Sequence, residues 1–198
     1  MEGYSSNHFL LAFYLLLALT TYINSSSAAA AAAASTEFIK TSCSATTYPT
    51  LCFNSLSSRA SAIQNSPKLL AHEALSVALD TARSTSTMML RLSHTRGMKP
   101  REKGAMKDCV EELSDSVDEL MNSLGEMSQP KGKSFEFMIS DIQTWVSAAL
   151  TDEDTCSEGF AGNAMNGKIK NIVRGRIVNV AHLTSNALAL INNYAGTP

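Results

Sequence analysis

The chain has 198 residues, of which 44% are hydrophobic and 17% charged, a composition typical of one globular domain rather than of a disordered protein. Sixteen Lys and Arg against eighteen Asp and Glu give a net charge of -2, which argues against a nucleic-acid binder and gives no general basis for docking on anionic membranes. Only ten Gly and five Pro occur, and Ala, Leu, Ser and Thr are abundant, so helices are favoured over a β-barrel or sandwich.

The N-terminal segment is interpreted as a secretory signal peptide. Fifteen nearly unbroken apolar residues, 9–23, precede a short polar stretch and seven consecutive alanines, 28–34. The apolar run is shorter than the roughly 20 residues of a membrane-spanning helix, and small residues satisfy an A-x-A cleavage rule at several registers. No Lys or Arg precedes the run, which is unusual for such a signal. We expect residues 1–34 to be removed, leaving a secreted domain, 35–198, that has no membrane contact.

All four cysteines lie in the expected mature domain, and an even count in an oxidising compartment predicts two disulfides. Four cysteines allow three pairings. Cys43 and Cys52 are nine residues apart, on either side of a turn at Tyr48 and Pro49, so we pair them locally. That choice leaves Cys109 to pair with Cys156.

Four long segments after residue 65 show helical periodicity, with apolar residues every three or four positions and no sustained period of two. The first begins at Ser66 and Pro67, an N-cap followed by proline at the first helical position. Polar breaks at 96–100, 128–132 and 166–167 separate the segments. The expected apolar stripes are Leu70, Ala74, Val77, Thr81, Met88 and Leu92; Met106, Cys109 or Val110, Leu113, Val117, Leu120 and Leu124; Met138, Ile142, Trp145, Val146 and Ala149; and Ile169, Val173, Ile177, Val180, Thr184, Ala187, Ile191 and Tyr194.

These segments predict an all-α fold. Long helices joined by short connections suit antiparallel neighbours, so an up-down-up-down four-helix bundle is expected over 66–198. A short N-terminal helical hairpin, closed by the first disulfide, is expected over 35–65. The second disulfide joins the second and third bundle helices.

No catalytic motif is present. The chain has no G-x-S-x-G elbow, phosphate-binding loop or G-x-G-x-x-G turn, and cysteines held in disulfides cannot act as nucleophiles. The cysteines lack C-x-x-C spacing and no histidine has a second metal ligand at i+4, so no metal site is expected. We expect neither enzymatic activity nor a cofactor.

The second bundle helix is strongly polarised in charge. Five bases and a single acid occupy residues 96–107, whereas six acids and no base occupy residues 108–119. Acids near a helix start are often only a solvated face that interacts well with the helix dipole. Asp115 and Asp118, at i and i+3, would project from one face and could instead meet a basic partner.

Several of these motifs together resemble the plant invertase and pectin methylesterase inhibitor family. The resemblance rests on the Cys43–Cys52 spacing around Tyr48 and Pro49, on Cys109 at the head of an acidic helix, on the run TWVSAALTDEDTC at 144–156 and on LTSNALALI at 183–191. It implies a secreted four-helix bundle with an N-terminal hairpin and disulfides in the order first to second and third to fourth. It also implies a non-enzymatic protein of the apoplast and cell wall that covers the active-site cleft of a carbohydrate enzyme.

The resemblance favours pectin methylesterase as the target, with acid invertase as the alternative. Invertase inhibitors tend to carry a Pro-Lys-Phe motif, but Leu or Gly follows the two Pro-Lys pairs of this chain, at 67–68 and 130–131. By resemblance, Asp115, Asp118 and Thr155 match positions that contact the methylesterase. Thr144 and Thr151 complete the expected interface, because the faces of both helices flank the expected Cys109–Cys156 bond. A monomer that binds one target molecule is expected. A small-ligand carrier with an apolar cavity is the other class of function considered.

Overall fold

The computed structural model describes residues 30–129, 134–162, 165 and 167–196, and every long element in this part of the chain is a helix. The expected signal peptide therefore lies outside the described residues up to position 29. Residues 30–43 are helical, and no described residue belongs to a β-strand. The other elements are α2 (Pro49–Leu56), a 3-10 turn (Ser57–Arg59), α3 (Ala60–Ile63), α4 (Pro67–Ser93), α5 (Pro100–Ser128), α6 (Phe135–Gly159) and α7 (Lys168–Ala195).

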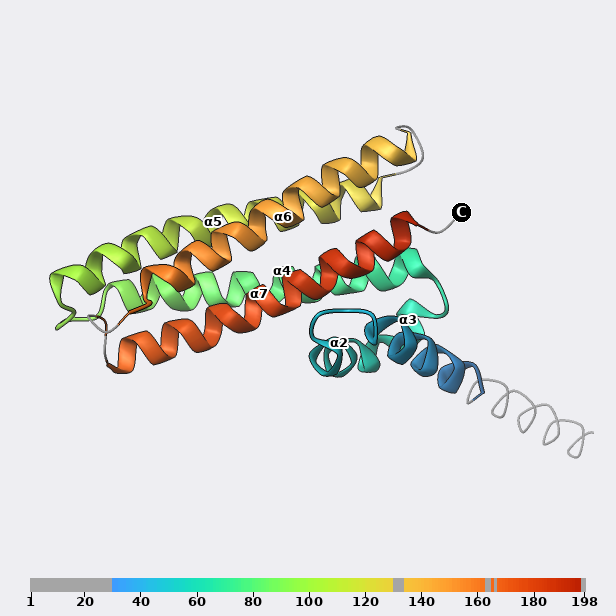
Figure 1. The fold of residues 1–198 in the computed structure, drawn as a ribbon, viewed down its shortest axis with the longest axis horizontal. Coiled ribbons are helices and arrows are strands. Elements are labelled where there is room, and N and C mark those ends of the chain that lie inside the picture. Colours follow the sequence, from blue (N-terminus) through green and yellow to red (C-terminus); the bar gives the residue numbers. More distant parts are fainter. Residues whose placement is uncertain (1–29, 130–133, 163–164, 166, 197–198) are drawn as a thin grey trace, which may run out of the picture.

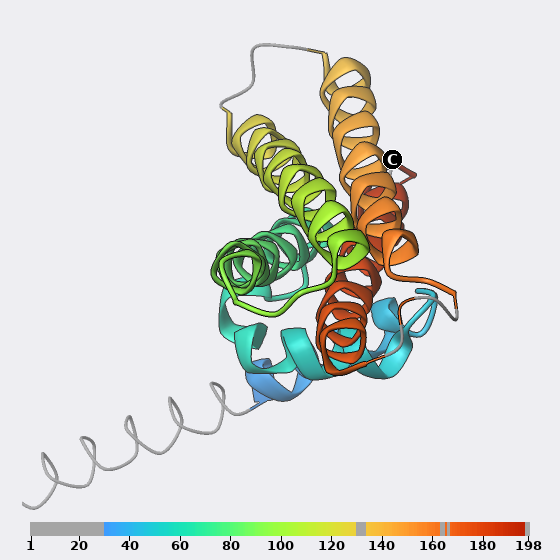
Figure 2. The ribbon, with the colours of Figure 1, turned by 90° about the vertical axis from the view of Figure 1, so that its left-hand side faces the viewer.

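The four long helices form the predicted bundle. Figure 1 shows α5 and α6 side by side above α4 and α7, while the N-terminal helices lie beneath one half of the lower layer. Figure 2, which looks along the bundle, shows the helices around a common centre. The all-α class, the four-helix bundle and the two disulfides predicted from the sequence are confirmed.

Local sequence explains where the bundle helices begin. Ser66 precedes Pro67 at the start of α4, and its side chain accepts a hydrogen bond from the Leu69 backbone N–H at 3.3 Å. Ser134 caps α6 in the same way. At the start of α5, the Lys99 backbone N–H donates to the Glu102 carboxylate at 2.8 Å. Helix α7 follows Gly167, whose φ of 154° favours glycine.

The bundle core consists of one buried stripe from each helix, with spacings that alternate strictly between three and four residues. This register is typical of left-handed bundles in which side chains interlock between neighbouring helices. The stripes are Ala71, Leu75, Ala78, Ala82, Thr85 and Met89 in α4; Met106, Cys109, Leu113, Ser116, Leu120, Ser123 and Met127 in α5; Ile139, Ile142, Val146, Ala149, Glu153 and Cys156 in α6; and Val173, Ile177, Val180, Thr184, Ala187 and Ile191 in α7.

The predicted stripes of α4 and α5 are displaced from the observed ones. In α4, the predicted positions Val77, Thr81 and Met88 are only half-buried, and the centre of the interface lies one position further along. That centre is rich in alanine, whose small side chain lets neighbouring helices approach closely but contributes little to an apolar pattern. In α5, Val117 is half-buried and Ser116 beside it is fully buried.

Both disulfides have the predicted pairing. Cys43 and Cys52 close the hairpin, with Cα atoms 5.6 Å apart, and Cys109 and Cys156 join α5 to α6, with Cα atoms 4.3 Å apart. The second pair encloses a loop 47 residues long and lies in the buried core. It therefore constrains the unfolded chain more than the first pair does.

The turn of the hairpin is held on α7 by a buried asparagine. The Tyr48 backbone N–H donates to Oδ1 of Asn186 at 3.0 Å, and Nδ2 of Asn186 donates back to the Tyr48 carbonyl at 3.0 Å. The Tyr48 ring stacks on the ring of His182, with centroids 3.6 Å apart. Together these contacts fix the disulfide-closed turn against the bundle.

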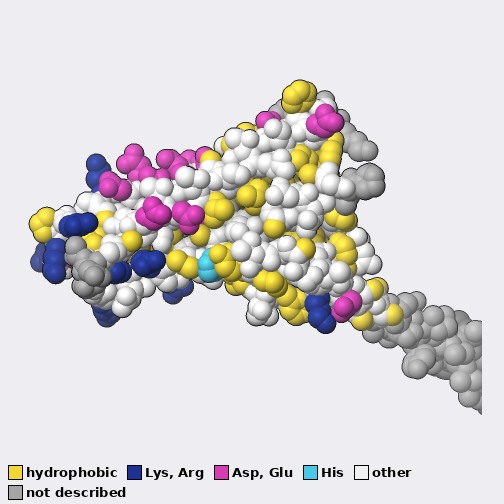
Figure 3. Space-filling model, in the orientation of Figure 1, with side chains coloured by type: hydrophobic (Ala, Val, Ile, Leu, Met, Phe, Trp, Pro, Cys, Tyr) yellow, Lys and Arg dark blue, Asp and Glu magenta, His cyan; other side chains and the backbone are white. Residues whose placement is uncertain are grey.

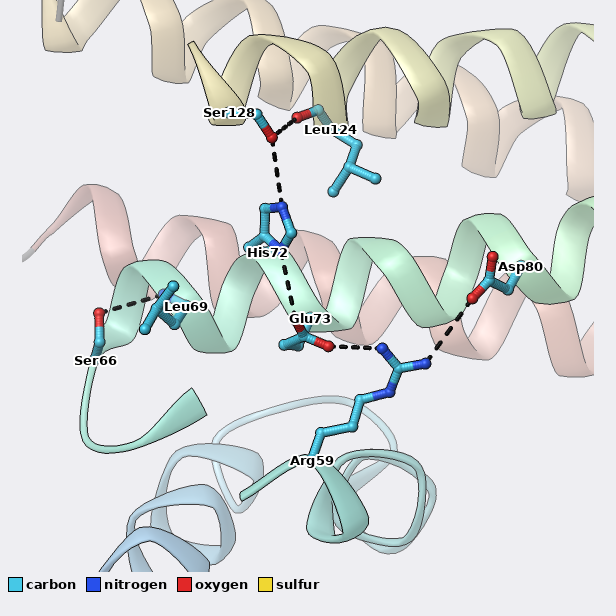
Figure 4. Close-up of polar contacts among 8 residues, drawn as sticks. All are labelled: Arg59, Ser66, Leu69, His72, Glu73, Asp80, Leu124 and Ser128. Atoms are coloured by element: carbon cyan, nitrogen blue, oxygen red, sulfur yellow. Dashed lines mark hydrogen bonds and ion pairs between the residues drawn. The ribbon is translucent and has the colours of Figure 1, made fainter. Parts of the chain in front are cut away.

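Polar contacts fix the other side of the hairpin on α4 (Figure 4). The Arg59 guanidinium donates to the Glu73 carboxylate at 2.6 Å and lies 3.9 Å from the Asp80 carboxylate. Glu73 is also 3.7 Å from His72, whose Nε2 lies 3.4 Å from the Ser128 hydroxyl of α5. This chain of contacts connects the hairpin, α4 and α5.

Across the described residues, no helix is long and apolar enough to cross a membrane.

Candidate functional site

Helices α5 and α6 form the antiparallel pair that carries the predicted interface. The Cys109–Cys156 bond ties the first part of α5 to the last part of α6. Figure 3 shows acidic side chains gathered along the edge of the surface formed by these two helices. The predicted acids and threonines are therefore on a rigid frame, which is the arrangement that a binding surface requires.

All five predicted interface residues are exposed. Asp115 and Asp118 project from α5, and Thr144, Thr151 and Thr155 project from α6. The structure brings Asp115 into electrostatic contact with Asp152 of α6 and places Thr155 in a groove between the two helices. Neither the electrostatic contacts of Asp152 nor the lining of this groove includes Asp118, Thr144 or Thr151, and the part of all five residues in an interface stays a prediction.

The three threonine hydroxyls all bond within α6. Each hydroxyl donates to the backbone carbonyl four residues earlier, at 2.8 Å for Thr144, 2.9 Å for Thr151 and 2.8 Å for Thr155. This bond holds the side chain in one rotamer against its own helix, and the hydroxyl oxygen can still accept a hydrogen bond. The threonines therefore offer a partner a row of preset acceptors and methyl groups, at little cost in side-chain entropy.

A cluster of four carboxyl groups spans the two helices. Glu112, Asp115 and Glu119 come from successive turns of α5, and Asp152 comes from α6. Burial raises the pKa of Glu119 to about 7, and repulsion by Asp152 adds to the effect. The pKa values of Asp152 and Glu112 are also raised, mainly by burial. Glu119 therefore keeps its proton at mildly acidic pH, where an isolated carboxyl group has lost it.

Beneath this cluster lies a carboxyl group with no solvent exposure, that of Glu153. Its Oε1 accepts hydrogen bonds from the hydroxyls of Ser116, at 2.8 Å, and Thr184, at 2.9 Å. Burial raises the pKa of Glu153 to about 8, although these two hydrogen bonds favour the charged form. Glu153 therefore connects α5, α6 and α7 behind the acidic face in its neutral form.

A groove of about 540 Å³ runs over the disulfide at the basic end of this face. Its walls combine charged and small residues: Arg101, Gly104, Ala105, Asp108, Cys109, Glu112, Thr155, Cys156, Glu158 and Gly159. Within the described residues, no group of three His, Cys, Asp or Glu is arranged to hold a metal ion. The face has the character of a polar docking surface rather than of a catalytic or metal centre.

Sequence reasoning identified Asp115 but not its partners in the cluster. Glu112 and Glu119 precede and follow it on the side of α5 that turns toward α6, and Asp152 lies in the TWVSAALTDEDTC run. Only residue spacing could have indicated these partners. Glu153 continues the apolar stripe of α6, in which buried residues are three or four positions apart. That spacing places Glu153 in the core and its neighbour Asp152 at the edge of the core.

Residues 37–190 match the family model described as plant invertase/pectin methylesterase inhibitor. The chain belongs to this family. It is 53% identical over 164 residues to a "21 kDa protein" of Daucus carota, an alignment that covers 81% of this chain and 85% of the relative. It is 48% identical over 162 residues to "Pectinesterase inhibitor 11" of Arabidopsis thaliana, which covers 80% of each chain.

A solved structure of another protein supports the fold of this chain. A mutant form of a pectin methylesterase inhibitor from Arabidopsis superposes with a TM-score of 0.60 at 21% identity, covering 76% of this chain and 92% of that chain. The family resemblance predicted from the sequence is confirmed by the family model. The family is non-enzymatic, in agreement with the prediction that this protein is not an enzyme.

Proposed function

We propose that this protein is a secreted inhibitor that binds a cell-wall pectin methylesterase one to one and covers its active-site cleft. The family model covers inhibitors of two enzyme classes, but the relative named above at 48% identity is called a pectinesterase inhibitor. A further relative, "Pectinesterase 2" of Arabidopsis thaliana, is 30% identical over 165 residues that make up 28% of its length. These names favour the methylesterase over acid invertase as the target.

The observation that carries the proposal is the acidic face on the disulfide-linked α5–α6 pair. An enzyme cleft is concave, so an inhibitor that fills it needs a convex surface that does not deform on binding. Two antiparallel helices joined by Cys109–Cys156 and by the hydrogen bonds of buried Glu153 supply such a surface. Rigid surfaces lose little conformational entropy on association, which favours tight binding.

The charge of this face also suits an enzyme whose cleft rim is basic. Asp115, which belongs to the carboxyl cluster, and Asp118, three residues further along α5, are both exposed. Their charges speed the encounter with a basic partner. The threonine row on α6 adds acceptors that need no rearrangement. A small-ligand carrier is disfavoured, because buried side chains fill the inward stripe of all four bundle helices.

The proposal is tested with the double variant Asp115→Asn and Asp118→Asn, which keeps side-chain size and helix pattern. We expect its affinity for a basic pectin methylesterase to fall, with a weaker dependence on salt. A buried charge contact would cost roughly 2 to 5 kcal/mol and a rim contact much less. The matched control is Glu37→Gln with Glu136→Gln, which removes two exposed acids at other places on the surface.

Circular dichroism first establishes that both double variants keep the helical content of the parent. If the Asp115 and Asp118 variant inhibits as tightly as the parent, with the same salt dependence, the acidic stripe is a solvated face. The proposed interface is then wrong, and inhibition must use another surface.

A further inference from the structure

One end of the bundle is strongly basic. It consists of the end of α4, the α4–α5 connection, the start of α5 and the start of α7, which lie together at one end of the molecule in Figure 1. Figure 3 shows Lys and Arg side chains gathered at this end. Ten of the sixteen bases of the chain belong to it: Arg91, Arg96, Lys99, Arg101, Lys103, Lys107, Lys168, Lys170, Arg174 and Arg176.

The small net charge of the chain conceals this concentration. Residues 91–107 and 160–178 hold these ten bases and one acid, Glu102, which gives the basic end a charge of +9. The whole chain carries -2, so the remainder of the sequence carries -11. The molecule is therefore strongly polarised, and its two charged regions can contact partners of opposite sign independently.

The bases of this end are available to a partner. All of them are exposed except Lys170, which is half-buried and donates to the Gly162 carbonyl at 2.7 Å. In the part of the chain that the structure describes, none of the ten forms an ion pair within 4 Å; the described ion pairs involve Lys40, Arg59 and His72. Like charges kept close together without counter-charges repel one another, and a polyanion relieves that repulsion.

Buried side chains anchor both segments that carry these bases. Met98 of the α4–α5 connection and Met165 of the α6–α7 connection are buried with Met106 and Phe160 in a core cluster of their own. The two basic segments are thereby packed against one body. The bases of both segments therefore lie at the same end of the bundle.

We infer that the basic end binds a linear polyuronide with free carboxylates, the product formed when the proposed target enzyme hydrolyses methyl esters. The inference rests on the proposed function for the choice of polymer. Hydrolysis converts each neutral ester into a carboxylate, which pairs with Lys and Arg, whereas the esterified polymer offers no charge. The inhibitor would then be concentrated where de-esterification has already occurred, with its acidic face free to bind the enzyme.

The character of the surface favours this polymer over other polyanions. Single-stranded nucleic acids are usually bound by Phe, Tyr or Trp side chains that stack on the bases, but the one such residue in the two segments, Phe160, is fully buried. Binding to a membrane surface is strengthened by apolar side chains that enter the lipid. Of the exposed large apolar residues, only Leu90 adjoins the basic segments, and Phe135 and Phe137 lie at the start of α6, at the other end of the bundle.

The test is direct binding of the full mature protein to polygalacturonate and to a methyl-esterified polymer of the same length, with a chelator present. We expect binding to polygalacturonate only, with affinity falling about tenfold or more between low and physiological salt. The variant Lys103→Gln, Lys107→Gln, Arg174→Gln should lose about tenfold in affinity. The matched control Lys40→Gln, Lys68→Gln, Arg83→Gln makes the same charge change elsewhere and should bind like the parent.

Three results would overturn the inference: equal binding of the esterified polymer, an equal loss in both triple variants, or tighter binding to vesicles containing phosphatidylserine than to polygalacturonate. Inhibition of the methylesterase is measured separately on a small neutral ester, where the basic-end variant should inhibit like the parent. A parent that binds the polymer but does not inhibit contradicts the proposed function alone. A parent that inhibits but does not bind the polymer contradicts this inference alone.

Discussion

The variant Glu153→Gln is expected to change how the stability of the bundle depends on pH. The Glu153 carboxyl has no solvent exposure, and its Oε2 has no hydrogen-bond partner among the described residues. Its pKa is raised from 4.5 to about 8 in the folded protein, chiefly by burial. Gln can accept the same two hydroxyl hydrogen bonds and cannot ionise.

The direction of the effect follows from proton linkage. Between pH 4.5 and 8 the folded protein keeps the Glu153 proton and the unfolded chain releases it, so unfolding becomes more favourable as pH rises. The stabilising contribution is complete below pH 4.5 and is lost as pH rises through about 8. Between about pH 5 and about pH 8, this site alone removes roughly 3 kcal/mol from the free energy of unfolding.

The assay is urea denaturation of the disulfide-bonded parent and Glu153→Gln at about pH 5 and about pH 8. We expect similar stabilities at the lower pH, within about 1 kcal/mol, and a variant that is more stable than the parent by roughly 3 kcal/mol at the higher pH. Asp154→Asn, a change at the exposed acid next in the chain, is the control and should follow the parent. Equal losses of stability in the parent and Glu153→Gln between the two pH values would refute the reasoning.

Three further predictions concern the frame and the acidic face. Asn186→Ala leaves the Tyr48 amide N–H without a partner and removes one of the two hydrogen bonds to the Tyr48 carbonyl, so it should lower the free energy of unfolding by about 2 kcal/mol, whereas an exposed asparagine of α7 should tolerate the same change. Replacing Cys109 should lower the free energy of unfolding by about 4 kcal/mol and replacing Cys52 by about 3 kcal/mol, because the two disulfides close loops of 47 and 9 residues. Denaturation curves that show the larger loss for Cys52 would contradict this. If a basic enzyme cleft covers the acidic cluster, its positive charge favours the ionised carboxylates, so inhibition should strengthen as pH rises through about 7, and Glu119→Gln should flatten that profile; an unchanged profile in the variant would exclude the cluster from the interface.

Much of the fold could be predicted because local rules act strongly here. Ser66 with Pro67 and the polar breaks between segments mark helix ends through capping and proline geometry, which depend on a few adjacent residues. The even cysteine count and the short Cys43–Cys52 spacing led to the observed disulfides. These features need no knowledge of how the helices pack.

Which side of each helix faces the core could not be predicted exactly, because burial depends on the position of a residue in the packed bundle and not only on its type. Ser116, Ser123 and Glu153 occupy central positions of the stripes, although their side chains are polar. Glu153 is tolerated there because two hydroxyls satisfy one oxygen and the proton removes the charge. Such compensation depends on three helices meeting, which no single segment reveals.

The order of charged residues along the chain was clear from the sequence, but their arrangement in the folded molecule could not be predicted. The sequence shows basic and acidic stretches in succession at the start of the second bundle helix. Only the bundle brings the bases of α7, beginning at Lys168, to the same end as those of α5. The net charge of -2 therefore argued against anionic partners in general, while the folded molecule has a basic end.

The measurement that tests the central claim most directly is a parallel titration of the purified mature protein into a pectin methylesterase assay and an acid invertase assay at about pH 5. Because the acidic α5–α6 face is proposed to cover the methylesterase cleft, methylesterase activity should fall linearly and end at one inhibitor per enzyme, while invertase activity stays constant. Loss of invertase activity with an unaffected methylesterase would contradict the proposed target and the interface assigned to it.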